Sequence, residues 1–151
     1  QVTMEFGAVL IPPRRAAMVR GGYWHDRTIN DDLDACLAEC PDKLALTAVS
    51  LDAGTTRRFT YRELATMADR IAVGLVRLGV GASDVVSCQL PNWWQFTLTC
   101  LACSRIGAVM NPLMHIFRER ELSFMLAHGQ SKVAIEAGRK LALGLRLGLG
   151  E

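Results

Sequence analysis

The second half of the chain alternates short Val-rich runs with helical patterns, and this alternation restricts the fold more than any other feature. DVVSCQL (84–90) is apolar nearly throughout, which is typical of a strand that is buried on both faces of a parallel sheet. Further strands are expected at AVMNPL (108–113) and KVAI (132–135), with helices at 93–106 and 118–129 between them. Strands and helices that alternate through short connections predict a parallel sheet with right-handed crossovers.

The first half is predicted to enter this unit through a hairpin and a long amphipathic helix. Segment 44–61 should form two strands around a turn at Asp52-Ala53-Gly54, with alternate residues on one side: Leu44, Leu46 and Ala48. Thr60 and Glu63 have the spacing of a capping box. Apolar residues then recur every three or four positions up to Leu78, and Gly79 follows as the stop.

The organisation that these patterns predict is an α/β fold, in which an N-terminal hairpin leads into a partial doubly wound parallel sheet. Residues 1–22, with paired prolines and glycines, are expected to be an irregular lead-in. Residues 23–135 form the domain, and an earlier helix within it should start near Thr28 and end before Pro41. Residues 136–151 alternate Leu with Ala, Gly or Arg and form an aberrant, low-complexity tail.

Composition excludes several classes of protein. Half of the 151 residues are hydrophobic and the net charge is only +2, so a disordered chain is excluded. Lysines and arginines are scattered, which disfavours nucleic acid as a partner, and no apolar run reaches the ~18 residues of a transmembrane helix. The chain start lacks the residue order of a signal peptide. Five cysteines, an odd number, disfavour a disulfide framework and suggest a cytoplasmic location.

Cys100 and Cys103 have the Cys-x-x-Cys spacing of redox and zinc motifs. They fall about two turns inside a predicted helix among apolar residues, so we expect small, buried core residues. A thiol redox protein would need both thiols exposed, and a zinc site would need about four ligands. Cys36 and Cys40 are too distant in sequence to be assumed partners of this pair.

The other candidates for chemistry also have ordinary structural explanations. None of the histidines (His25, His115 and His128) has a second ligand at a metal-like spacing, and His128 suits the C-terminal end of a helix dipole. Gly79-Val80-Gly81 follows a helix and precedes a strand, which is the reverse of a phosphate-binding turn, so a helix stop is expected. Trp93 and Trp94 lie at the C-terminal end of a predicted parallel strand, where α/β sheets bind ligands, although core packing is the default.

Two charged segments complete the candidates. The run from Arg118 through Glu119 and Arg120 to Glu121 is expected to be the solvated start of a helix. Arg139 and Lys140 could meet a phosphate of coenzyme A, but both fall in the tail.

Several stretches together resemble the AMP-forming acyl-CoA synthetases, a family of adenylate-forming ligases. FTYREL (59–64) is similar to a Tyr-x-Glu-Leu signature near the start of those enzymes, and 68–86 and 101–113 resemble the shared segments that follow it. The segments 23–46 and 89–96 resemble the cyclohexanecarboxylate–CoA and short-chain fatty-acid–CoA ligases. The similarity runs from about Arg14 to Ile135, and the motifs are specific as a set.

The resemblance implies a reaction in which a small carboxylic acid attacks Mg-ATP to form an acyl-adenylate, and coenzyme A then displaces AMP. The family's phosphate-binding loop, ribose-binding Asp, hinge Arg and catalytic Lys lie downstream of the region that matches. We therefore assign no catalytic, cofactor-binding or metal residue here, and expect an inactive N-terminal part that does not bind ATP, Mg or coenzyme A productively. A stand-alone nucleotide-binding or interaction module is the alternative, and an uncovered sheet edge predicts self-association.

Overall fold

A computed structural model describes residues 12–25 and 27–138 of the chain. The helices are α1 (Pro12–Arg20), α2 (Ile29–Glu39), α3 (Tyr61–Arg77), α4 (Trp94–Arg105) and α5 (Glu119–His128). The strands are β1 (Leu44–Ser50), β2 (Thr55–Thr60), β3 (Val85–Gln89), β4 (Val109–Pro112) and β5 (Ser131–Glu136). None of the helices among these residues is long and apolar enough to cross a bilayer.

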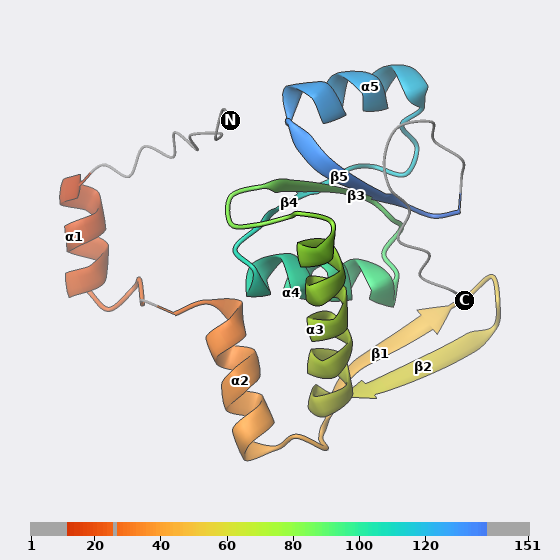
Figure 1. Ribbon diagram of the computed structural model, residues 1–151. Coiled ribbons are helices and arrows are strands. Elements are labelled where there is room, and N and C mark those ends of the chain that lie inside the picture. Colours follow the sequence, from red (N-terminus) through yellow and green to blue (C-terminus); the bar gives the residue numbers. More distant parts are fainter. Residues whose placement is uncertain (1–11, 26, 139–151) are drawn as a thin grey trace.

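The parallel sheet has the order β4-β3-β5, with β3 in the centre. Val86 of β3 pairs with Met110 of β4 and with Val133 of β5, and both pairings are parallel. The connection from β3 to β4 runs through α4, and the connection from β4 to β5 runs through α5. These two helices lie on opposite sides of the sheet (Figure 1). The predicted doubly wound parallel unit is therefore confirmed.

The main hydrophobic core lies between this sheet and the layer of α3 and α4. Leu75 of α3 and Leu98 of α4 are completely buried, as are Val86 and Cys88 of β3. Period-two alternation places Val86 and Cys88 of β3, and Leu90 directly after the strand, on the same face. This core explains why the helix patterns after Thr60 and after Asn92 are strongly apolar.

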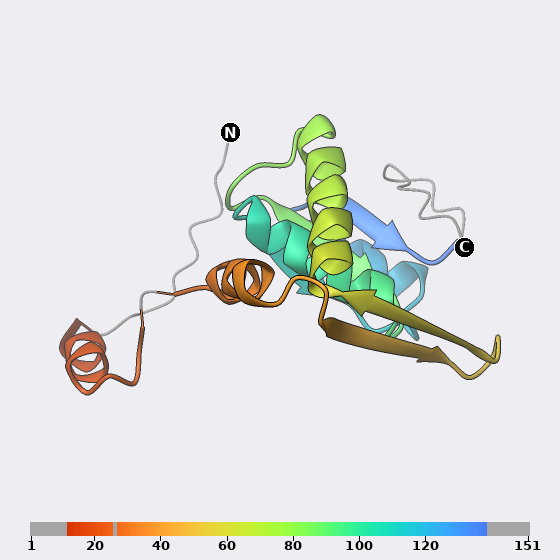
Figure 2. The ribbon, with the colours of Figure 1, turned by 90° about the horizontal axis from the view of Figure 1, so that it is seen from below.

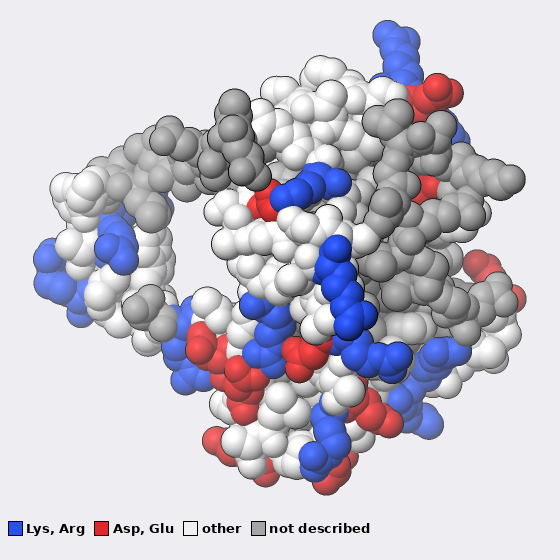
Figure 3. Space-filling view, in the orientation of Figure 1, with Lys and Arg blue, Asp and Glu red and all other residues white. Residues whose placement is uncertain are grey.

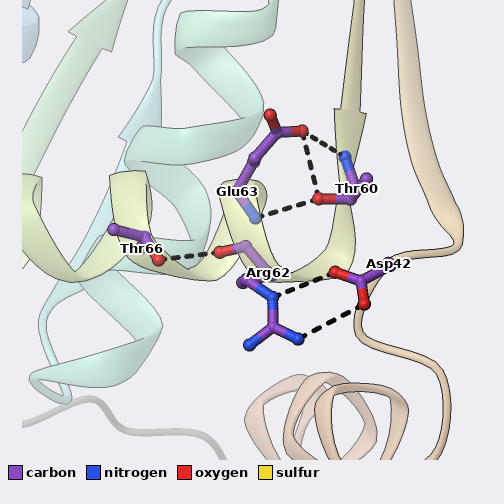
Figure 4. Close-up of polar contacts among 5 residues, drawn as sticks. All are labelled: Asp42, Thr60, Arg62, Glu63 and Thr66. Atoms are coloured by element: carbon purple, nitrogen blue, oxygen red, sulfur yellow. Dashed lines mark hydrogen bonds and ion pairs between the residues drawn. The ribbon is translucent and has the colours of Figure 1, made fainter.

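A capping box fixes the start of α3, as the sequence predicts. The backbone N–H of Glu63 donates to the Thr60 hydroxyl over 3.2 Å, and the Glu63 carboxylate accepts from the Thr60 N–H over 2.8 Å (Figure 4). Beside it, the Arg62 guanidinium contacts the Asp42 carboxylate at 3.0 Å and lowers the pKa of that acid. The pair joins the start of α3 to the segment between α2 and β1.

The hairpin of β1 and β2 forms as predicted, but one residue lies on the wrong side. Thr47 pairs with Arg58 in an antiparallel ladder, and the register shifts between Leu44 and Leu46. Because a shift changes the alternation of side chains, Leu44 is half exposed, and Ala45 packs against the core together with Leu46. The expectation that Leu44 shares the inner side is therefore wrong.

Part of the irregular lead-in expected at 1–22 is a helix, because α1 forms there, while residues 1–11 lie outside the described residues. None of the side chains of α1 is buried, and Figures 1 and 2 show the helix standing apart from the other elements. Its prolines, Pro12 and Pro13, occupy the first turn, where a missing N–H is tolerated. Gly21 closes the last turn by donating its N–H to Ala17 over 2.9 Å.

Candidate functional site

The carboxyl edge of the parallel sheet is the place where this topology can form a ligand site. The crossovers that follow β3 and β4 run on opposite faces. The chain therefore moves from β3 to one side of the sheet at β4 and then crosses back to the other side at β5, so the winding of the sheet switches between β3 and β5. In open α/β sheets such a switch point leaves a crevice outside the strand ends. The segments that reach this edge are Leu90–Trp94 after β3, Leu113–Phe117 after β4, and Ala137 and Gly138 after β5.

Trp94, one of the two tryptophans predicted at this edge, packs against the hairpin. Its ring lies 5.4 Å from the ring of Phe59, and the Arg57 guanidinium sits 5.3 Å above it. Cation–π contacts of this kind contribute about 0.5–1 kcal/mol at exposed sites. Trp94 therefore joins α4 to β2, and core packing, the default expectation, holds for this tryptophan.

Trp93, the second predicted tryptophan, lies in the segment after β3 and is 44% exposed. In the segment after β4, the large apolar side chains of Met114 and Ile116 are each 57% exposed. Gln89, the last residue of β3, ties that segment to the strand, because its amide donates to the carbonyls of Met114 at 3.0 Å and Phe117 at 2.9 Å. The segments that follow β3 and β4 therefore both carry exposed apolar side chains.

The structure separates the two cysteines of the Cys-x-x-Cys motif. Cys103 is buried, and burial raises the pKa of its thiol to about 12. Cys100 is exposed on the same helix, so the expectation that both are buried is wrong for Cys100. One face of α4 packs into the core and the other faces solvent. Because a helical turn takes about 3.6 residues, side chains three positions apart do not point in the same direction, and Cys103 can face the core while Cys100 faces solvent. A redox pair that needs both thiols exposed is excluded.

The remaining candidates do not come together. His25 and His115 are exposed, and His128 stacks on Phe124 at the end of α5 with the ring centres 5.5 Å apart. No group of three His, Cys, Asp or Glu side chains within the described ranges could hold a metal ion. Arg139 and Lys140 lie outside the described residues.

Gly79 and the charged run at Arg118 have the structural roles expected of them. Gly79 adopts a left-handed φ of 83° directly after the end of α3, as a helix stop requires. The Glu121 carboxylate accepts from the backbone N–H of Arg118 over 3.0 Å, and this bond lowers the pKa of Glu121. Both features support the turns on which they lie.

Sequence reasoning missed two groups of polar residues. Asn111 donates to the Ser87 hydroxyl over 2.9 Å, and that hydroxyl also shares a hydrogen bond with Ser131, so one polar row crosses all three strands. On the other side of the sheet, Arg105 of α4 makes two hydrogen bonds to Asp34 of α2, at 2.6 and 2.9 Å. Arg105 lowers the pKa of Asp34 through these bonds. The polar residue types on β3 and β4 were a signal for the first group, whereas the second joins positions 71 residues apart.

Comparison with known proteins decides what this scaffold belongs to. The sequence model of the AMP-binding enzyme family matches residues 33–146, which is most of the chain. The chain belongs to the AMP-binding enzyme family. The match continues past Ile135 into the segment 136–151, where the sequence alone suggests that the resemblance stops.

The relatives are ligases and adenylating enzymes. The medium-chain fatty-acid–CoA ligase of Escherichia coli K12 is 35% identical over 133 residues, which is 88% of this chain and 22% of that protein. The apo structure of MbtA from Mycobacterium smegmatis is 30% identical with a TM-score of 0.69, covering 82% of this chain and 22% of that one. The N-terminal subdomain of NpsA from Klebsiella oxytoca, in complex with anthranilyl-AMSN, has a TM-score of 0.61 and 27% identity. It covers 72% of this chain and 27% of the NpsA chain. This chain thus spans about a fifth of the length of the curated relative.

Proposed function

We propose that this chain is the N-terminal part of an ATP-dependent carboxylate–CoA ligase and that it is inactive alone. The observation that carries the proposal is the family match at 33–146 on a chain that covers 22% of a fatty-acid–CoA ligase. The parent enzyme would form an acyl-adenylate from a small carboxylic acid and ATP, and then an acyl-CoA. The branch suggested by 23–46 and 89–96, which acts on cyclohexanecarboxylate or a short fatty acid, is part of this proposal, as is a cytoplasmic location.

The phosphate-binding loop, ribose-binding Asp and catalytic Lys of the family lie downstream of the region that matches, so the described residues are assigned no step of this reaction. Their role in the parent is to build the sheet and to present its carboxyl edge. At that edge, the exposed side chains of Trp93, Met114 and Ile116 would face the segments that bring the phosphate-binding loop and the catalytic Lys of the family.

The test of inactivity is release of pyrophosphate from ATP in the presence of butyrate, octanoate or cyclohexanecarboxylate. The purified 151-residue chain should release none above the rate without acid. Full-length E. coli medium-chain fatty-acid–CoA ligase with octanoate is the positive control under the same conditions. Acid-dependent turnover by the chain alone would overturn the proposal.

The alternative is a stand-alone nucleotide-binding module, and the exposed ring of Trp93 at the switch point favours it. Bases stack on exposed aromatic side chains, and each such contact is worth about 1–3 kcal/mol. Calorimetric titration with ATP, AMP and coenzyme A distinguishes the two functions. Heat that Trp93→Ala abolishes would support the module, and the absence of heat with all three ligands would leave the inactive ligase part.

A further inference from the structure

Two thiols outside the Cys-x-x-Cys motif lie one helical turn apart at the end of α2. Cys36 is in the last turn, and Cys40 is the residue at which the helix ends, with its N–H donating to the Cys36 carbonyl over 2.8 Å. Both side chains are half-buried, and neither is in a disulfide. The pKa of Tyr61 is raised, chiefly through its interaction with the Cys36 side chain, and Cys40 adds a smaller effect.

We propose that Cys36 and Cys40 form a reversible disulfide and are the redox-active pair of this chain. Residues four apart in a helix have Cα atoms about 6 Å apart along the axis, within the roughly 4.4–6.8 Å that disulfides span. Their Cβ atoms are about 5–6 Å apart in a regular helix, whereas a disulfide needs about 3.5–4.5 Å. Cys40 can supply the difference, since its φ of −147° shows that it has already left the helix.

The other thiols are unsuited to this reaction. Cys88 and Cys103 are buried in the core, and burial raises their thiol pKa values to about 11 and 12. Because the thiolate is the attacking species, such thiols react slowly. Cys100 is exposed, but its motif partner is Cys103. Among the five cysteines, only Cys36 and Cys40 are thus both accessible and adjacent.

The reaction with a low-molecular-weight disulfide such as oxidised glutathione is balanced. One cysteine thiolate attacks the glutathione disulfide, so that a mixed disulfide forms and one glutathione thiolate leaves. The second cysteine thiolate then attacks the protein sulfur of the mixed disulfide and displaces the second glutathione. Two electrons pass from the cysteine pair to the oxidant, and the two protons lost by the cysteines reappear on the two glutathiones.

The disulfide would affect the segment between α2 and β1, which is hydrogen-bonded to the start of α3. Pro41, next to Cys40, accepts from the Arg62 N–H over 2.9 Å, and Lys43 accepts from the Tyr61 N–H over 3.1 Å. Drawing Cys40 toward Cys36 displaces this segment, so the disulfide is strained. Strained disulfides are readily reduced, and they are the labile and regulatory ones.

Trypsin separates the two sets of cysteines, which makes the test direct. Cleavage after Arg27 and Lys43 releases peptide 28–43 with Cys36 and Cys40, and cleavage after Arg77 and Arg105 releases 78–105 with the other three. The intact chain is equilibrated with glutathione and glutathione disulfide, free thiols are alkylated, and the masses of the tryptic peptides are measured by mass spectrometry. We expect 28–43 to lose two hydrogens with no alkylation, and 78–105 to stay fully alkylated.

Variants and reversal complete the experiment. Cys40→Ala should leave Cys36 alkylated or carrying glutathione, whereas the matched control Cys100→Ala should leave the oxidation of 28–43 unchanged. Dithiothreitol should restore both thiols, and hydrogen exchange at the Tyr61 and Arg62 amides should rise only in the oxidised chain. Loss of hydrogens in 78–105 first, or stable glutathione adducts on 28–43 without an internal bond, would overturn the proposal. The mapping of the unsubstituted chain decides it even if a variant fails to fold.

Discussion

The two faces of the parallel sheet are equally buried on β3 but are held by different forces. Cys88 is 0% exposed on the face toward α3 and α4, and Ser87 is 1% exposed on the face toward α5. On the first face, apolar side chains from the helices α2, α3 and α4 and from the strands β2, β3 and β5 pack into one core. The second is crossed by the hydrogen-bonded row of Asn111, Ser87 and Ser131 and is covered by the single helix α5 (Figure 1).

This difference shows that burial does not reveal which interaction stabilises a strand. On the α3–α4 face, stability comes from the apolar area removed from water, which is worth about 25 cal/mol per Å². On the α5 face, a net hydrogen bond contributes only about 0.5–1.5 kcal/mol, while an unsatisfied buried group costs about 1–3 kcal/mol. Substitutions on the first face should therefore lower the free energy of unfolding mainly by removing packed volume. Substitutions on the second face should lower it mainly by leaving buried polar groups without a hydrogen-bond partner.

The largest effect is expected from Leu98→Ala, on the α3–α4 face. Leu98 is completely buried, so the variant should lose about 2–5 kcal/mol of unfolding free energy from lost transfer energy and a cavity. The matched control is Leu122→Ala on α5, whose side chain is buried outside the main core cluster and whose site can relax toward solvent. Urea unfolding followed by circular dichroism measures both. Equal losses in the two variants would show that the faces do not differ in packing.

Ser87→Ala should have the next largest effect, because it breaks the polar row at its centre. The Asn111 amide and the Ser131 hydroxyl would both lose a buried partner, which predicts a loss of about 1–3 kcal/mol. Ser123→Ala, on the exposed side of α5, is the matched control and should stay within about 0.5 kcal/mol. The double variant with Asn111→Ala should be less damaging than the sum of the single variants, since both share one interaction. Strict additivity would mean that the row is not one network.

Most of the fold could be predicted from the sequence, because its strongest signals are local. The alternation from Asp84 to Ile135 gives the parallel strands and their crossovers, and Thr60 with Glu63 gives the start of α3. The sequence predictions are wrong where the pattern of apolar and polar residues does not determine the backbone geometry. A register shift moves Leu44 outward, and the helix α1 forms although none of its side chains is buried.

The candidate site was predictable only in part. The position of Trp93 and Trp94 at a strand end follows from the order of elements, but Trp94 is taken up by Phe59 and Arg57 of the hairpin. That contact joins segments more than 30 residues apart, and no periodicity encodes it. Similarly, helical spacing cannot tell which of Cys100 and Cys103 faces the core. Charged residues around α2 and the lower part of α3 dominate that side of the molecule in Figure 3, which the scattered sequence positions did not show.

A smaller effect is expected from Gln89→Ala, at the carboxyl end of the polar face. The variant removes both hydrogen bonds to the Met114 and Phe117 carbonyls, at a cost of about 1 kcal/mol, because these carbonyls lie near solvent and can bind water instead. Local order should suffer more than global stability. Hydrogen exchange should therefore accelerate at amides 114–118 while the exchange of β3 core amides changes little. If the loop amides keep their protection, the two Gln89 hydrogen bonds do not order this loop.

The smallest effect on stability is expected from Phe124→Ser, on the outer side of α5. Phe124 is 67% exposed, so the unfolding free energy should change by about 0.5 kcal/mol or less. Its ring nevertheless adds apolar area to the α5 side, next to β5, whose outer edge has no strand partner among the described residues. Exposed apolar area and an open strand edge both promote association between copies. Sedimentation velocity over a range of concentrations should thus show weaker self-association for the variant, whereas Ser123→Ala should associate like the unsubstituted chain. If the unsubstituted chain sediments as a monomer at every concentration, the α5 side is not an association surface, and the contrast between the two faces concerns folding alone.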